Sequence, residues 1–222
     1  MIPVASLHIG CAGWNVPKSI PTYTKSHDQE SEVRSHLERY TDFFQAVEFN
    51  SSFHHSHLPS TYVRWRRTVA PGFRFSVKFP QNITHIFRLE NCDSELERFI
   101  FEVSHLEEKL GILLIQIPPS LQFDVKITDR FLSKLRNLCT VNLALEPRNF
   151  SWFKPEAFQL LEQHNVALVW ADPRPTLFYM ADLPKTSSAI YIRLHGSPQI
   201  YSSSYNLPYL ENLSKKLFSK TK

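Results

Sequence analysis

Short apolar runs rich in β-branched and aromatic residues recur along the chain, and longer stretches with helical spacing of apolar positions separate them. This alternation is typical of a parallel α/β sheet whose buried strands are linked by helices. It predicts seven strands, at residues 7–11, 46–50, 74–78, 112–116, 141–146, 167–171 and 190–194.

The stretches between these runs predict helices, several of them preceded by Ser, Thr or Asp in capping positions. Pro-rich joints at Pro118-Pro119 and Pro173-Arg174-Pro175 fall where connecting loops are expected. The predicted helices are residues 30–43, 59–68, 94–106, 127–138 and 155–163, with a last amphipathic segment at 207–218.

Polar or charged residues follow six of the expected strands at their C-terminal ends. Because parallel strands end on one face, and a barrel carries its active site on that face, the pattern predicts one shared polar pocket. At a single position, a charged residue that only marks the exit of the chain into solvent explains the pattern equally well. The residues are Glu48, Asn50, Lys78, Gln116, Glu146, Arg148, Asp172, Arg193 and His195.

Length and composition fit one globular domain over residues 1–222, with 42% hydrophobic and 21% charged residues. No apolar run approaches the roughly 18 residues of a membrane helix, and the N-terminus lacks a signal-like pattern, so we expect no membrane association and a cytoplasmic location. Cys11, Cys92 and Cys139 form no motif and are expected to be reduced thiols. The formal net charge of +4 is mildly basic and is not clustered.

Seven motifs in series resemble the YecE-like family, also called domain of unknown function 72. The resemblance implies a TIM-type barrel with an uncharacterised, enzymatic pocket, and it brings no settled reaction or cofactor. The motifs are Gly10-Cys-Ala-Gly13-Trp14, Val47-Glu48-Phe-Asn50-Ser-Ser-Phe53, Lys78-Phe-Pro80 with Ile83-Thr84-His85, Gln116-Ile-Pro118-Pro119-Ser120, Glu146-Pro-Arg148 with Ser151-Trp152, Ala171-Asp172, and Tyr191-Ile-Arg193-Leu-His195-Gly196 with Tyr201 and Tyr205.

The chain departs from the family at its C-terminal end, where members usually continue into an eighth strand and a closing helix. We therefore expect a TIM-type (β/α)8 barrel that lacks its eighth strand and closing helix. The first and seventh predicted strands would then have unpaired edges. A second departure is His54-His55-Ser56-His57, which we interpret as a solvated turn because no carboxylate or thiolate is close in sequence.

The predicted pocket combines carboxylates, histidines and permanent cations, a set that suits acid–base chemistry on an anionic substrate. Glu146 or Glu48 is the expected general base, and His195 or His85 the general acid. Lys78, Arg148 and Arg193 are the expected anion clamp, while Asn50, Gln116 and Asp172 would orient the substrate. An alternative is that Glu146 with Arg148, or Glu48 with Lys78, forms a buried ion pair that orients loops.

Aromatic side chains adjoin these polar residues, namely Trp14, Phe53, Trp152, Tyr201 and Tyr205. Flat rings beside hydrogen-bonding groups favour a ring-bearing substrate such as a sugar or a nucleobase, although packing beneath the loops explains them as well. We expect no metal, because three nearby cations oppose the binding of another positive ion, and no cofactor, because the glycines at 10 and 13 lack a phosphate-binding spacing.

The sequence therefore favours an enzyme with hydrolase-type chemistry on a small polar, anionic molecule. A nucleic-acid-binding protein that grips phosphate and stacks bases is an alternative, favoured by the pI of 8.9. A catalytically inactive truncated barrel is another. The sequence does not indicate an oligomeric state.

Overall fold

The computed structural model describes residues 6–17, 19–20, 34–173 and 183–220. The strands run parallel wherever they pair. They are β1 (Gly10–Ala12), β2 (Ala46–Phe49), β3 (Arg74–Lys78), β4 (Leu110–Gln116), β5 (Asn142–Glu146), β6 (Val166–Leu168), β7 (Trp170–Asp172) and β8 (Ile192–Leu194).

The helices follow the strands along the chain, as expected for an α/β fold. The α-helices are α1 (His36–Tyr40), α2 (Pro59–Thr68), α3 (Asp93–Ser104), α4 (Val125–Leu138), α5 (Pro155–Gln163) and α6 (Leu207–Lys220). Short turns of other helix types are η1 (Ser51–Phe53), η2 (Asn82–Ile86), η3 (Glu107–Lys109) and η4 (Phe150–Trp152).

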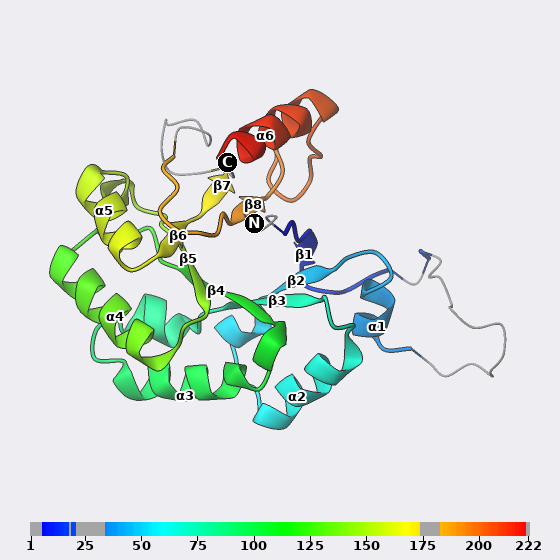
Figure 1. Ribbon diagram of the computed structural model, residues 1–222, viewed down its shortest axis with the longest axis horizontal. Helices are drawn as coiled ribbons and strands as arrows, with labels where there is room; N and C mark the ends of the chain where they lie inside the picture. The colour runs from blue at the N-terminus through cyan, green and yellow to red at the C-terminus, as the bar shows by residue number, and fades with distance from the viewer. Residues whose placement is uncertain (1–5, 18, 21–33, 174–182, 221–222) are drawn as a thin grey trace, which may run out of the picture.

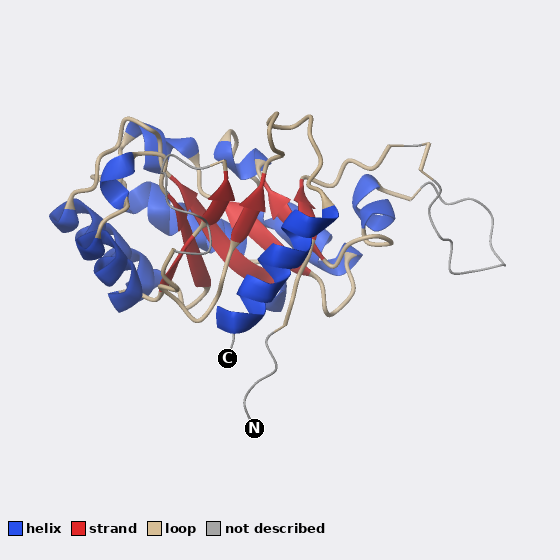
Figure 2. Cartoon of the chain, turned by 90° about the horizontal axis from the view of Figure 1, so that it is seen from above, coloured by secondary structure: helices blue, strands red, loops and turns tan. Residues whose placement is uncertain are grey.

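The strands lie on a curved path around the centre of the molecule, and helices α1 to α5 cover its outer side (Figure 1). Hydrogen bonds join β1 to β6 in chain order into one sheet, and β7 and β8 form a second. Seen from above, the strands stand side by side and their arrowheads point the same way (Figure 2). The prediction of a mostly parallel α/β fold is therefore confirmed.

Alternation along the strands divides the core into two clusters. On β4, Leu113 and Ile115 face the helices and join the larger cluster, while Ile112 and Leu114 belong to a smaller, inner cluster with Ala144 of β5. Successive side chains of a strand point to opposite faces, so the polar residues Gln116 and Glu146 continue the inner rows at the strand ends.

The sixth predicted strand, residues 167–171, is broken at Val169 into β6 and β7. The N–H of Val169 donates to the carbonyl of Leu145 at 3.0 Å, whereas the N–H of Trp170 donates to the carbonyl of Tyr191 at 2.9 Å. Beside β6, the Thr186 hydroxyl accepts from the Leu168 N–H at 2.8 Å and donates to the Val166 carbonyl at 2.6 Å. A side chain thus takes the place of a neighbouring strand at β6.

Barrel closure is not complete in the described residues. No ladder joins β8 to β1 there, and α6, rather than a further strand, follows β8; β6 and β7, consecutive in the chain, belong to different sheets. β1 is exposed along its length, and it begins at Gly10, later than the predicted range 7–11. Leu7 and Ile9, which were expected in the strand, are 70% and 61% exposed. The edges of β1 and β8 that face away from their partners are unpaired within the described part of the chain.

Several element boundaries match the prediction, among them β3, α2 and α5. Helix α1 is shorter than the predicted 30–43: residues 30–33 lie outside the described residues, and the capping box formed by Ser35 and Glu38 starts the helix at His36. None of the helices in the described ranges has both the length and the apolar content that a bilayer crossing requires.

Candidate functional site

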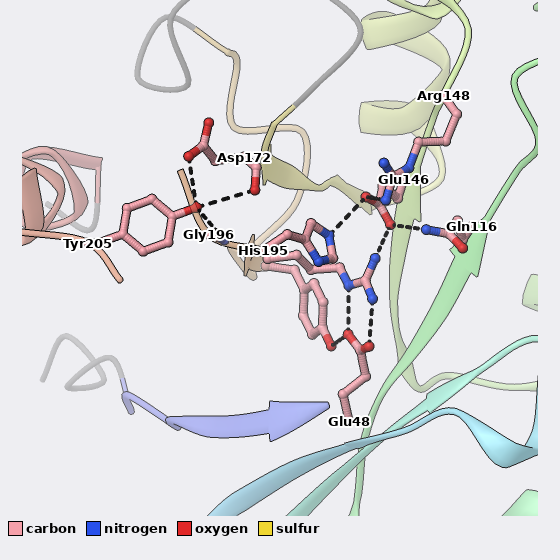
Figure 3. Close-up of polar contacts among 10 residues, drawn as sticks. Glu48, Gln116, Glu146, Arg148, Asp172, His195, Gly196 and Tyr205 are labelled. Atoms are coloured by element: carbon pink, nitrogen blue, oxygen red, sulfur yellow. Dashed lines mark hydrogen bonds and ion pairs between the residues drawn. The ribbon is translucent and has the colours of Figure 1, made fainter. Parts of the chain in front are cut away.

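Arg193 of β8 joins the two sheets by pairing with carboxylates from β2 and β5. Its Nε and Nη2 donate to Oε2 and Oε1 of Glu48 at 2.8 and 2.7 Å, and its Nη1 donates to Oε2 of Glu146 at 2.5 Å. Figure 3 labels Glu48 and Glu146 and marks the contacts of their carboxylates with dashed lines. All three side chains are buried. Burial opposes the charge of Arg193, but the hydrogen bonds to Glu48 and the negative charges of Glu48 and Glu146 together outweigh burial and raise the pKa of Arg193.

Glu146 is the most connected carboxylate of this cluster. Oε2 also accepts from Nε2 of Gln116 at 2.8 Å, Oε1 lies 2.7 Å from Nη2 of Arg148, and the His195 Nε2 lies 3.9 Å from Oε1 (Figure 3). Burial alone would raise the pKa of Glu146, but His195 and the two guanidiniums outweigh it and lower the pKa to about 2. The carboxylate is therefore ionised and firmly held at neutral pH.

Tyr191 and Ser76 belong to the same cluster, and sequence reasoning did not select them for the site. The Tyr191 hydroxyl donates to Oε2 of Glu48 at 2.9 Å and lies 2.7 Å from Oγ of Ser76. Burial and the neighbouring Glu48 raise the pKa of Tyr191 well above its usual value. The alternation of side chains along a strand could have identified both residues, because positions two apart point to the same face. Tyr191 lies two positions before Arg193, and Ser76 lies two positions before Lys78.

Lys78, at the end of β3, lies beside Phe53 and His85. Its Nζ is 4.0 Å from the centroid of the Phe53 ring, and the His85 ring meets that same ring edge-on with centroids 5.0 Å apart. Burial, and then the positive charge of Arg193, lowers the pKa of Lys78. Burial, and then Lys78, lowers the pKa of His85. The predicted alternative of a Glu48–Lys78 ion pair is wrong, because Glu48 pairs with Arg193 instead.

Asp172 and Tyr205 form a second cluster, set apart from the first in Figure 3. The Tyr205 hydroxyl donates to Oδ2 of Asp172 at 2.8 Å and accepts from the Gly196 N–H at 3.0 Å. Burial and Asp172 raise the pKa of Tyr205 to about 12. Tyr201 is 85% exposed, and its ring meets the ring of His195 edge-on at 5.7 Å. These contacts order the segment after β8.

Two of the five aromatic residues predicted at the site pack in the core instead. Trp14 stacks on Phe49 with ring centroids 5.3 Å apart and also contacts Trp65. Trp152 is 1% exposed, and its Nε1 donates to the carbonyl of Leu121. The packing interpretation therefore accounts for both tryptophans, because Trp152 belongs to the larger core cluster and Trp14 is partly buried against it.

Four buried polar atoms of predicted site residues have no hydrogen-bond partner within the described residues. They are Oδ1 of Asn50, Oε1 of Glu146, Nε of Arg148 and Nε2 of His195. Buried polar atoms are nearly always paired, so unpaired ones at strand ends mark places where a bound molecule or water could be held. Among the residues that the structure describes, no three His, Cys, Asp or Glu side chains are grouped as metal ligands. His57, from the histidine-rich turn, contacts Oγ of Ser51 at 2.8 Å.

The arrangement can hold an anion and move a proton, but it does not leave a carboxylate free to act as a base. Both glutamates are bound by guanidiniums, and a carboxyl with a pKa near 2 is a weak base at neutral pH. Besides Glu146, the described site residues Asn50, Arg148 and His195 each have a buried polar atom without a hydrogen-bond partner, and the Lys78 amine lies over the Phe53 ring without one. Amine and imidazole groups are thus better suited than the glutamates to react at this site.

Comparisons with known proteins give the family. A family profile described as "Protein of unknown function DUF72" matches residues 8–220. The UPF0759 protein YunF of Bacillus subtilis (strain 168) is 30% identical over 212 residues, which cover 86% of this chain and 70% of YunF. The UPF0759 protein YecE of Escherichia coli (strain K12) is 30% identical over 112 residues, 50% of this chain but only 38% of YecE.

Two solved structures share the fold. The DUF72 family protein TM1631 of Thermotoga maritima MSB8 has a TM-score of 0.75 and 24% identity, with 96% of this chain and 87% of that chain covered. The DUF72 family protein EF0366 of Enterococcus faecalis V583 has a TM-score of 0.72 and 20% identity, with 96% and 85% covered. The resemblance carried by the seven motifs is confirmed, and the chain is a member of the YecE-like DUF72 family.

Proposed function

We propose that the C-terminal ends of the strands form the active site of an enzyme that acts on a small, polar, anionic molecule. The observation that supports it best is the buried cluster around Arg193, with the unpaired Nε of Arg148 and Nε2 of His195 beside it. Polar groups buried without partners are costly, and they persist most often at sites that bind or react. The proposal assigns each role in the reaction to a side chain of this protein and none to a cofactor or a metal.

Hydrolysis stays the proposed reaction class, with one change in the assignment of roles. Glu146 and Glu48 fix the two arginines, and His195 transfers the proton, because its Nε2 is unpaired within the described residues. Arg148, 28% exposed at its side chain, offers the substrate an anion contact, and Phe53 offers a flat surface to a ring. Trp14 and Trp152 have no part in the proposal, since they pack in the core.

We also propose that β1 to β8 represent seven strands of a TIM-type barrel, with the sixth broken into β6 and β7. The inner and outer rows of side chains support this, since barrel strands alternate between interior and helix-facing residues. The cytoplasmic location, the single domain over residues 1–222 and the absence of a cofactor stay predictions.

Nucleic-acid binding has less support than the small-molecule site. Stacking bases needs exposed rings beside cations, and two of the rings considered for it, Trp14 and Trp152, pack within or against the larger core cluster. The proposed site also holds Arg148 and Arg193 in ion pairs with Glu146 and Glu48, which reduces the positive charge that a phosphate backbone would meet.

The test is anion binding followed by thermal shift and calorimetry with phosphate, citrate and sugar phosphates. Arg148→Gln should reduce the affinity for the anions that bind by about tenfold, because it removes one charge-assisted contact. The matched control is Arg64→Gln on α2, an exposed arginine on the helical layer. Equal loss of affinity in both variants, or no loss in Arg148→Gln, would contradict the proposal.

A further inference from the structure

We propose that Lys78 is an amine nucleophile that forms an imine with the carbonyl group of a small anionic substrate. The inference rests on the proposed anion site, names the reacting group and the substrate class for it, and assigns imine formation there in place of hydrolysis. Three observations support it: Lys78 lies on the inner face at the end of β3, its amine contacts the Phe53 ring, and Glu48 and Glu146 bind Arg193.

The backbone places the Lys78 side chain on the inner face at the end of β3. Ser76, two positions earlier, contacts Tyr191 inside the strand array, and alternate residues of a strand share a face. The Ser52 hydroxyl of η1 donates to the carbonyl of Lys78 at 2.6 Å and so holds the end of the strand against the following turn. The amine therefore starts from a fixed backbone position beside the Arg193 cluster.

The amine has no ion pair or hydrogen bond within the described residues, although two carboxylates are close enough to act on its charge. Glu48 and Glu146 bind Arg193 at 2.5 to 2.8 Å and leave Lys78 with the face of Phe53 as its close contact. The positive charges of Arg193 and Arg148 oppose protonation of the amine. A desolvated lysine next to other cations is the recognised environment of a nucleophilic amine.

Two other lysines show that burial or an aromatic neighbour alone is not enough. Lys109 is buried, but its Nζ donates to the carbonyls of Val69 and Ala70, so the amine is occupied. Lys154 lies 5.0 Å from the ring centroid of Phe123, but it is exposed and remains solvated. Lys78 combines the aromatic contact with partial burial and an unoccupied amine.

The step balances without an oxidant or a reductant. The nitrogen lone pair forms a bond to the carbonyl carbon, and the electrons of the C=O π bond move to oxygen. One proton passes from nitrogen to that oxygen to give a carbinolamine, and the loss of one water molecule leaves the C=N bond. His85 is placed to carry the proton, because it contacts the same Phe53 ring as Lys78 and its Nδ1 is held 2.8 Å from Oγ1 of Thr84.

The first experiment measures the reactivity of the amine itself. The full chain is labelled with a trace of acetic anhydride at pH 7, and each lysine is quantified by peptide mass spectrometry. Lys78 should react at least about fivefold faster than Lys154, because more of its amine is neutral. Equal or slower labelling of Lys78 would overturn the inference.

The second experiment traps the imine. The full chain is incubated with pyruvate, glyoxylate or pyridoxal 5′-phosphate and reduced with borohydride, and the adduct is mapped. The adduct should form on Lys78 with at least one of the three, be lost in Lys78→Arg and persist in Lys154→Arg. Lys78→Arg keeps the positive charge, and an unchanged melting temperature shows that it folds. The absence of a Lys78 adduct with all three probes overturns the inference.

A separate measurement distinguishes this failure from failure of the proposed function. Pyridoxine 5′-phosphate carries the same ring and phosphate without the aldehyde, so its binding tests the anion site alone. If it binds wild type and loses affinity in Arg148→Gln while no imine forms, the site stands and only the role of Lys78 is wrong. If Lys78 is trapped by pyruvate while neither phosphate compound binds, the amine chemistry stands and the anion assignment of Arg148 is wrong.

Discussion

The six-stranded sheet and the two-stranded sheet differ in how their strands are held. Strands β2 to β5 each pair on both sides and carry buried side chains of the larger core cluster, whereas β8 pairs with β7 alone in the described residues, and its last residue, Leu194, is 37% exposed. Yet β8 supplies Arg193, which binds Glu48 and Glu146 of the larger sheet. Ion pairs between side chains thus link the two sheets, whereas backbone hydrogen bonds link the neighbouring strands within each sheet.

Replacing Arg193 is expected to have the largest effect. Arg193→Met leaves two buried carboxylates without their partner, and breaking a buried pair from one side costs about 3 to 5 kcal/mol in the free energy of unfolding. Urea denaturation measures the loss, and hydrogen exchange should rise first in β7 and β8. A loss below that of the exposed control Arg64→Met would show that the two sheets are joined by other contacts.

A pair of leucine substitutions tests the same contrast through packing. Leu113→Ala, on β4 and 0% exposed, should cost about 2 to 5 kcal/mol because it leaves a cavity in the larger cluster. Leu194→Ala, on β8, should cost less than about 1 kcal/mol because its side chain already meets solvent. Both values come from urea denaturation at pH 7, and similar losses in the two variants would contradict the contrast.

A smaller effect is expected when acid protonates Glu146, which pairs with Arg193 between the two sheets. A carboxyl whose pKa falls from 4.5 to about 2 on folding contributes about 3 kcal/mol to stability. This contribution is complete above pH 5 and is lost as the pH falls toward 2, because the unfolded chain takes up the proton first. Unfolding measured from pH 7 to pH 2 should therefore be less pH-dependent in Glu146→Gln than in wild type. The exposed control Glu162→Gln should retain the full dependence of wild type.

Much of the fold could be predicted because the strands follow local patterns. The apolar runs gave β3 at its observed bounds, and the common direction of parallel strands predicted that Glu48, Glu146 and Arg193 would meet where the strands end. The break at Val169 could not be predicted, because it depends on the Thr186 hydroxyl, which comes from a later segment and binds beside β6.

The sequence indicated which residues form the site better than it indicated which of them pair with each other. Glu48 meets Arg193 across 145 positions of sequence, and no local pattern tells which of several cations will reach a given carboxylate. The tryptophans were misassigned for a related reason. Trp14 and Trp152 stand next to polar motif residues in sequence, but which way their rings turn is decided by the packing of distant residues such as Trp65 and Leu121.

The break at Val169 also ties the position of β5, which carries Glu146, to that of β8. Adjacent amides, those of Val169 and Trp170, bind Leu145 on one side and Tyr191 on the other. Leu145 immediately precedes Glu146, and Tyr191 lies two residues before Arg193, so this single peptide step sets the height at which guanidinium and carboxylate face each other. A deletion of one residue here would shift β7 by one residue against β6, so the side chains of β7 would change faces and β7 would lose its register with β8.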